Sequence, residues 1–157
     1  MCQCIDYLEN DYLISEFCNC GSLKELQEEK SYKLQRPAIA KIMYKLVQGV
    51  KDIAKAGMTH MDLKPANVML HLPNRSEELS EYSEYEKKKF IKNLDLTAVD
   101  FQIKIIDLGL AAEESYLKGK IGTELTMAPQ VFKKMEYTNK ADVWSIGMTM
   151  SLLLDGV

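Results

Sequence analysis

The sequence predicts an α+β fold that is mostly helical, and two segments carry most of this prediction. From Pro37 to Ala56, apolar residues recur every three or four positions, which is typical of an amphipathic helix that ends at Gly57. From Ala141 to Leu154 the chain is largely apolar, as in a helix at the centre of a core. The 157 residues, 46% of them hydrophobic and 27% charged, suffice for one globular domain with one core.

The predicted strands are short. Residues 4–18 indicate two strands around the turn Glu9–Asp11, because Asn and Asp side chains bond back to the local backbone in turns. Phe101–Ile106 indicates a further strand. Between these strands, Ser22 is a favourable N-cap for a helix over Leu23–Glu29.

Residues 74–100 differ in character from the rest of the chain. They are rich in charges of both signs and lack the clear period of a buried element. We interpret them as a surface insertion, helical in part, and favour a solvated loop over a docking segment.

The charge balance excludes some classes of partner. A net charge of −3 argues against nucleic acid, because phosphate binding needs a surplus of Lys and Arg.

The longest apolar run near the end, Ile146–Leu154, is too short to cross a bilayer, so we expect no membrane partner. The opening residues lack a basic segment followed by an apolar one, which predicts an intracellular, cytoplasmic protein.

The four cysteines occur as two pairs, Cys2-x-Cys4 and Cys18-x-Cys20. Four thiols suffice for a zinc site, but the usual zinc spacing is Cys-x-x-Cys. We therefore favour buried or half-buried thiols over zinc. Because no signal peptide is visible, we expect a reducing compartment and no disulfide framework.

The chemistry-bearing residues follow the long helix. The segment His60–Leu70 holds an acid, Asp62, a base, Lys64, and an amide, Asn67, within six positions. Forty residues later, a predicted strand ends at Asp107. Magnesium prefers hard oxygen ligands, which Asn67 and Asp107 would supply if the two strand ends meet.

These segments resemble the serine/threonine protein kinase family of the eukaryotic type. The catalytic loop of that family appears as HMDLKPAN and its metal-binding motif as DLG. Three further segments match in the same order: a hinge, LISEFCNCGSL; the end of an activation segment, GTELTMAPQ; and the start of the helix behind it, DVWSIG. Five motifs in register cover nearly the whole chain outside the insertion.

The resemblance implies a role for each matched residue. Asp62 is the base for the substrate hydroxyl, Lys64 is the cation on the transferring phosphoryl group, and Thr123 bonds the catalytic Asp. Asn67 and Asp107 are the Mg²⁺ ligands. The expected reaction is transfer of the γ-phosphoryl group of ATP to Ser or Thr of a protein substrate.

The resemblance also implies the nucleotide contacts and the lobes. The residues expected to line the nucleotide site are Ser15 at the gatekeeper, Glu16, Cys18, Ser22 and Met69. Residues 1–18 would be small-lobe strands and hinge, and residues 19–157 part of the helical large lobe. His60 and Trp144 are expected to be structural, the first through hydrogen bonds and the second through packing.

Some family features are missing from the sequence as it stands. Neither a glycine-rich loop nor a strand Lys precedes the hinge, which predicts a partial kinase domain that would not transfer phosphate by itself. A non-catalytic pseudokinase-like binding module, or a truncated gene product, is the alternative interpretation.

Met61 replaces the Arg that precedes the catalytic Asp in the family, where it pairs with a phosphate on the activation segment. Methionine has neither charge nor a donor for that bond. We therefore predict that a kinase containing this segment keeps its turnover after phosphatase treatment, even if Ser115 or Tyr116 is modified. Loss of activity on treatment, rescued by an acidic residue at one site, would contradict this.

Overall fold

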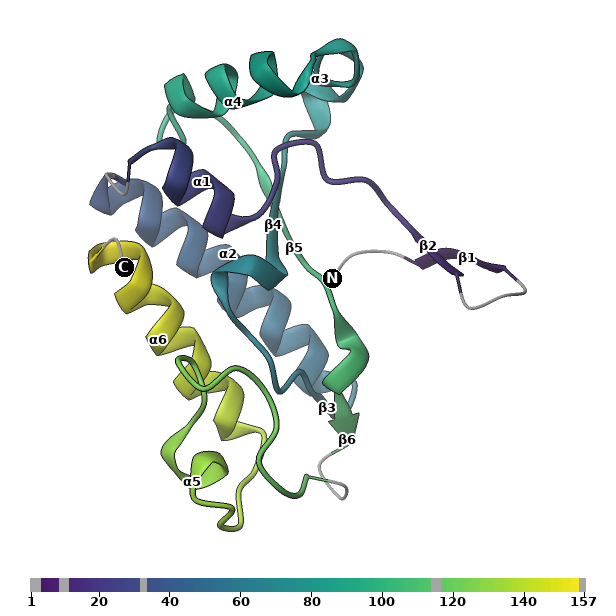
Figure 1. Cartoon of the computed structure of the whole chain (residues 1–157), viewed down its shortest axis with the longest axis vertical. Helices are drawn as coiled ribbons and strands as arrows, with labels where there is room; N and C mark the ends of the chain where they lie inside the picture. Colours follow the sequence, from purple (N-terminus) through teal and green to yellow (C-terminus); the bar gives the residue numbers. More distant parts are fainter. Residues whose placement is uncertain (1–3, 9–11, 32–33, 114–116, 156–157) are drawn as a thin grey trace.

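Two long helices form the centre of the structure. The computed structural model describes residues 4–8, 12–31, 34–113 and 117–155, and in it α2 (Arg36–Lys55) lies beside α6 (Lys140–Asp155) (Figure 1). Both predicted helices are confirmed to within one residue at each end. Gly57 follows α2 with φ +76°, a backbone conformation that glycine adopts without steric cost.

Helix α1 (Leu23–Glu29) packs its buried residues into the same core. The predicted cap is confirmed: the Ser22 hydroxyl accepts from the backbone N–H of Glu25, and the Glu25 carboxylate accepts from the backbone N–H of Ser22 at 2.7 Å. This capping box satisfies two donors that the helix leaves unpaired.

A two-stranded antiparallel ladder carries part of the functional site. β4 (Val68–His71) pairs with β5 (Gln102–Ile105), with Val68 opposite Ile105 at one end and His71 opposite Gln102 at the other. The strand predicted over Phe101–Ile106 is thus confirmed. The insertion leaves the ladder at its His71–Gln102 end.

Two smaller antiparallel pairs complete the strands of the described residues. β1 (Cys4–Leu8) pairs with β2 (Tyr12–Ser15), which confirms the predicted strands, while their turn at 9–11 lies outside the described residues. This hairpin stands away from the helical body (Figure 1). β3 (Met58–Thr59) pairs with β6 (Ala112–Glu113) just before the catalytic loop.

The insertion is folded rather than a solvated loop. It contains the short turn Pro73–Arg75, α3 (Ser76–Glu81) and α4 (Glu84–Asn93), so the prediction of helix in part is confirmed and the favoured loop is wrong. Its apolar residues are too widely spaced to give a period, yet four of them are buried in the main core: Leu79, Ile91, Leu94 and Leu96.

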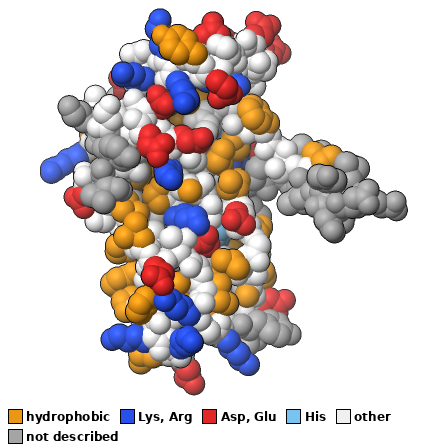
Figure 2. Space-filling model, in the orientation of Figure 1, with side chains coloured by type: hydrophobic (Ala, Val, Ile, Leu, Met, Phe, Trp, Pro, Cys, Tyr) orange, Lys and Arg blue, Asp and Glu red, His pale blue; other side chains and the backbone are white. Residues whose placement is uncertain are grey.

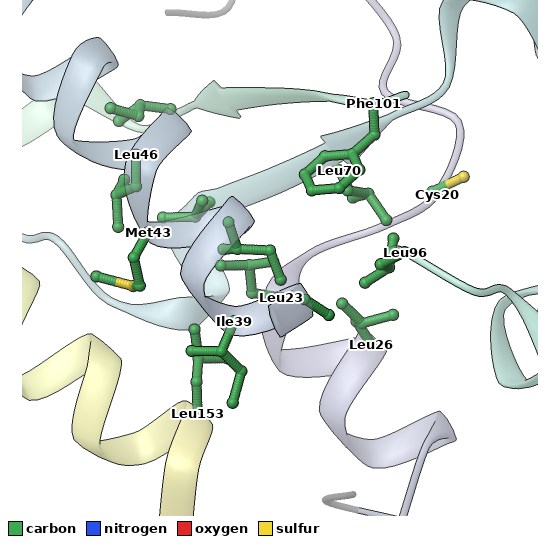
Figure 3. Packing of buried hydrophobic residues seen from close by; sticks show 14 of the residues in the cluster. Cys20, Leu23, Leu26, Ile39, Met43, Leu46, Leu70, Leu96, Phe101 and Leu153 are labelled. Atoms are coloured by element: carbon green, nitrogen blue, oxygen red, sulfur yellow. The ribbon is translucent and has the colours of Figure 1, made fainter. Parts of the chain in front are cut away.

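The main core fills the space between α1, α2, the β4–β5 ladder and the insertion. In Figure 3, Leu96 from the insertion, Leu70 from β4 and Phe101 lie around Leu23 and Leu26 of α1. Phe101 is fully buried. The insertion is therefore part of the hydrophobic core of the domain.

One side of α6 is exposed. Trp144 is 45% exposed, so its expected packing role stays a prediction, and Val143, Met150 and Leu154 are exposed with it. Apolar side chains gather along the flank where α6 lies, while charged ones crowd the end that carries α3 and α4 (Figure 2). Among the described helices, none has the length and apolar character needed to span a membrane.

The buried position of the insertion generates a stability prediction. We expect Leu79→Ala to lower the free energy of unfolding by about 2–5 kcal/mol, because Leu79 is fully buried and the truncation leaves a cavity. Tyr85→Ala, at a site that is 75% exposed, should change it by less than about 0.5 kcal/mol. Denaturant unfolding of both variants would measure this, and equal midpoints would show that the insertion is outside the cooperative unit.

Candidate active site

The backbone of the catalytic loop is fixed by a carboxylate from α6. Asp142 accepts the backbone N–H of His60 at 2.7 Å and that of Met61 at 3.0 Å. Burial raises the pKa of Asp142, while the two backbone hydrogen bonds act in the opposite direction. Sequence reasoning gave Asp142 no role of its own, although a buried acid in an otherwise apolar helix was a signal that it pairs with something.

His60 connects the loop to the end of β5, which confirms its structural role. Its ring is fully buried. Nδ1 accepts from the backbone N–H of Asp62 at 3.3 Å, so Nε2 carries the proton and donates to the carbonyl of Ile106 at 3.0 Å. This side chain joins the residue before Asp107 to the loop that contains Asp62.

The Asp62 carboxylate receives two hydrogen bonds at each oxygen. Oδ1 accepts from the backbone N–H of Thr123 at 2.8 Å and from its hydroxyl at 2.7 Å. Oδ2 accepts from Lys64 Nζ at 2.7 Å and from Asn67 Nδ2 at 3.1 Å. Lys64 Nζ also lies 2.7 Å from the Thr123 hydroxyl. The structure thus brings together four of the predicted site residues from two distant segments.

These contacts determine the ionisation of Asp62. Burial by itself would raise its pKa, since the side chain is only 7% exposed. The hydrogen bonds from Lys64 and Thr123, together with the charge of Lys64, outweigh burial and hold the pKa of Asp62 below its usual value. The group is therefore a carboxylate at neutral pH, which is the form that can accept a proton.

Gly122 permits the close approach of the activation segment to the catalytic loop. Its φ is +104°, and a Cβ at this position would lie 2.3 Å from the carbonyl oxygen of Met61. Any side chain would push Thr123 away from Asp62. The sequence identified Gly122 only as part of a motif. Its close contact with Met61 could not be predicted, because the two residues are about sixty positions apart in the chain.

The Met61 side chain occupies the position at which the kinase family has an Arg, and it makes apolar contacts there. It is buried, and it forms a small apolar cluster with Ala128, Val131 and Ala141. Ile121 of the activation segment packs against this cluster. The segment is thus attached to the loop by apolar contact as well as through Thr123. Ser115 and Tyr116 lie outside the described residues.

Asn67 and Asp107 lie at neighbouring strand ends. The carbonyl of Asn67 accepts the backbone N–H of Ile106 at 3.0 Å, next to the pairing of Val68 with Ile105. The Asn67 side chain turns its nitrogen toward Asp62, leaving its oxygen available to a cation, and Asp107 is exposed at the strand end. An amide oxygen and an exposed carboxylate fit Mg²⁺, which takes few protein ligands and completes its shell with water and phosphates.

The predicted hinge residues lie along the edge of the ladder. Glu16 follows Ser15, the exposed last residue of β2, and pairs with Lys104 of β5 at 3.0 Å. Lys104 is the ladder partner of Met69. The Glu16 side chain therefore ties the hinge to the β4–β5 ladder, which carries Met69 and follows directly on Asn67.

The remaining hinge residues meet β4. Ser22 bridges to Met69, and the N–H of Leu70 bonds the carbonyl of Gly21 at 2.8 Å. Cys18 and Met69 line one hollow of about 370 Å³. The hydroxyl of Ser22 is engaged in the capping box, so its expected contact with a nucleotide stays a prediction, as do those of the other hinge residues.

The cysteines that the structure describes are buried thiols. Cys18 and Cys20 are both buried, and burial raises the pKa of Cys20 to about 12, against the opposing charge of Arg75. A thiol with such a pKa is a poor metal ligand at neutral pH. Cys2 and the side chain of Cys4 lie outside the described part, and within that part no three His, Cys, Asp or Glu side chains are grouped for a metal.

Comparison with known proteins agrees with this geometry. The sequence profile of the protein kinase domain matches residues 1–157. The chain belongs to the protein kinase family. Its relatives include the serine/threonine-protein kinase unc-51 of Caenorhabditis elegans, with 30% identity over an alignment 157 residues long that covers 98% of this chain and 16% of that protein.

Two further relatives have the same level of identity. Serine/threonine-protein kinase 33 of Bos taurus is 30% identical over 150 residues, and the DNA damage response protein kinase DUN1 of Saccharomyces cerevisiae is 30% identical over 148. Both alignments cover 92% of this chain and 27% of the relative. The chain thus spans about a quarter or less of the length of these relatives.

The kinase-like site generates a prediction on pH. The folded-state pKa of Asp62 is lowered, so its ionic contacts stabilise the fold above the unfolded pKa, and this contribution is lost as the pH falls through the folded pKa. Lys64→Met removes the hydrogen bond and the charge while burial remains, so the pKa of Asp62 should rise. Titration of the Asp62 carboxyl signal by NMR would measure this pKa. Lys45→Met is the control, because Lys45 forms an ion pair with the exposed Asp100 and not with Asp62. An unchanged pKa would contradict the assignment of Lys64.

Proposed function

We propose that residues 1–157 are the hinge and large-lobe portion of a serine/threonine protein kinase, which transfers the γ-phosphoryl group of ATP to a Ser or Thr hydroxyl with Mg²⁺. One observation carries the proposal: the buried Asp62 carboxylate is held by Lys64, Asn67 and Thr123 within 3.1 Å. Structural ion pairs rarely bring an acid, a base, an amide and a hydroxyl to one buried point.

In this proposal each residue performs one step. Asp62 accepts the proton of the substrate hydroxyl. As it does so, the hydroxyl oxygen of the substrate forms a bond to the γ-phosphorus and the bond between that phosphorus and ADP breaks. The ammonium of Lys64 contacts both Asp62 and Thr123. It therefore lies beside the base, where it would bind an oxygen of the transferring phosphoryl group. Thr123 orients the carboxylate through two hydrogen bonds to one oxygen.

The metal and the nucleotide have separate supports. Asn67 and Asp107 would hold Mg²⁺, which neutralises charge on the phosphates. The hinge residues Glu16 and Cys18 would offer backbone groups to adenine above Met69. A pseudokinase that binds nucleotide without transferring phosphate is the alternative, and turnover distinguishes the two.

The proposal predicts a split between turnover and binding. In the protein that contains this segment, we expect Asp62→Asn to lower kcat by about 10²–10⁴-fold with little change in nucleotide affinity, because the base acts only in the chemical step. Initial rates on a Ser/Thr protein substrate and nucleotide titration would measure both, and Asp100→Asn, at an exposed Asp, is the matched control.

Binding is tested through the metal ligand. Asp107→Ala should weaken ATP binding in the presence of Mg²⁺ and leave it unchanged in EDTA, because only the metal-dependent contact is removed. Equal affinities of parent and variant with Mg²⁺ would refute the metal role. Turnover that survives Asp62→Asn in a folded protein would refute the kinase mechanism.

A further inference from the structure

The start of the insertion and the residue Leu72 that leads into it bond directly to the segment that follows the hinge. The buried Asn19 side chain donates to the carbonyl of Leu72 at 2.8 Å and accepts the N–H of Leu72 at 2.8 Å. Its nitrogen also lies 3.2 Å from the Ser76 hydroxyl. The side-chain amide of Asn19 thus binds both the N–H and the C=O of one backbone residue, as a neighbouring strand would, and joins the start of the insertion to the hinge segment.

Helix α4 reaches the same segment from the other end of the insertion. Lys87 Nζ lies 5.8 Å from the centroid of the Phe17 ring, within the range of a cation–π contact. The Lys87 side chain is only 21% exposed, although its Glu84 partner in the helix is 86% exposed. Lys87 therefore lies against the hinge rather than in solvent.

Other contacts hold α4 at this position. Lys88 pairs with Glu29 of α1 at 3.8 Å, and Lys30 donates to the carbonyls of Lys92 and Leu94, at 3.1 and 2.7 Å. Ile91 is buried in the main core. Since the middle and the C-terminal end of α4 are anchored, the helix can act on the hinge as a rigid element.

Between these elements lies the hollow of about 370 Å³ described above. Its walls are the hinge segment, α1 and α4, and its lining includes Cys18, Met69, Lys87 and Ile91. Two residues expected to contact adenine thus share one concavity with two residues of the insertion. The insertion contributes to the immediate surroundings of the proposed nucleotide site.

We propose that α4 is a positioning element for the hinge and that Lys87 acts on the nucleotide site through Phe17. The inference rests on the proposed function, because it assumes that the hinge backbone reads adenine. Phe17 is 70% exposed and lies between Glu16 and Cys18, whose backbone groups would make those contacts. Loss of the cation over its ring frees the hinge segment while the core contacts of α4 remain.

The test compares two lysines of the same helix in the protein that contains this segment. Lys87→Ala should raise the KM for ATP by about two- to fivefold, the value expected from a cation–π contact to an exposed ring, with kcat and Tm unchanged. Lys87→Arg should restore the parent KM, because a guanidinium also binds a ring face. Lys89→Ala is the control, since Lys89 lines a different hollow, on the side of Arg75 and Phe90.

A double-mutant cycle with Phe17→Ala identifies the contact. If Lys87 acts through the ring, Phe17→Ala with Lys87→Ala should be no worse than Phe17→Ala by itself. Fully additive effects, or a Lys87→Ala variant that behaves as Lys89→Ala does, would overturn the inference and leave the proposed function intact. A parent protein that binds no nucleotide, with or without Mg²⁺, would overturn the proposed function itself.

Discussion

The site depends on one buried carboxylate that is not itself near the proposed chemistry. Asp142 projects from α6 and accepts two consecutive backbone N–H groups of the catalytic loop. Met61 between them has φ +71°, a conformation that a non-glycine residue keeps only when its surroundings hold it. The direction of Asp62, the next residue, follows from that turn, and Thr123 and Lys64 then assemble on its carboxylate.

The burial of Asp142 has an energetic cost that the loop offsets. A carboxylate that is 3% exposed loses its hydration, which is why its pKa is raised. Two backbone donors compensate, and neither would otherwise have a partner there. A polar contact of this kind stabilises the fold little in net terms but specifies one arrangement of the loop, because any other leaves a buried charge unpaired.

How much the sequence could predict follows from the range of the interactions involved. The ends of α1, α2 and α6 depend on local spacing, caps and glycine, and their prediction holds to within a residue or two. The grouping of Asp62, Asn67 and Thr123 was accessible through motif order. Leu79 and Ile91 were missed because few apolar residues in a charged segment give no period, although the fold buries them. The sequence indicated only that Met61 lacks the charge of the family's Arg. In the structure, Met61 contributes apolar packing to the cluster that it forms with its neighbours.

The β4–β5 ladder has a consequence for how this domain tolerates changes in length. The two expected metal ligands lie beyond its Val68–Ile105 end, and the whole insertion connects the opposite end. The entropic cost of closing a loop grows only with the logarithm of its length, so residues added at the His71–Gln102 end change the closure term little. The four residue pairs of the ladder separate that end from Asn67 and Asp107. Residues could therefore be added in this connection, away from its buried positions, while the register that places the two ligands side by side stays the same.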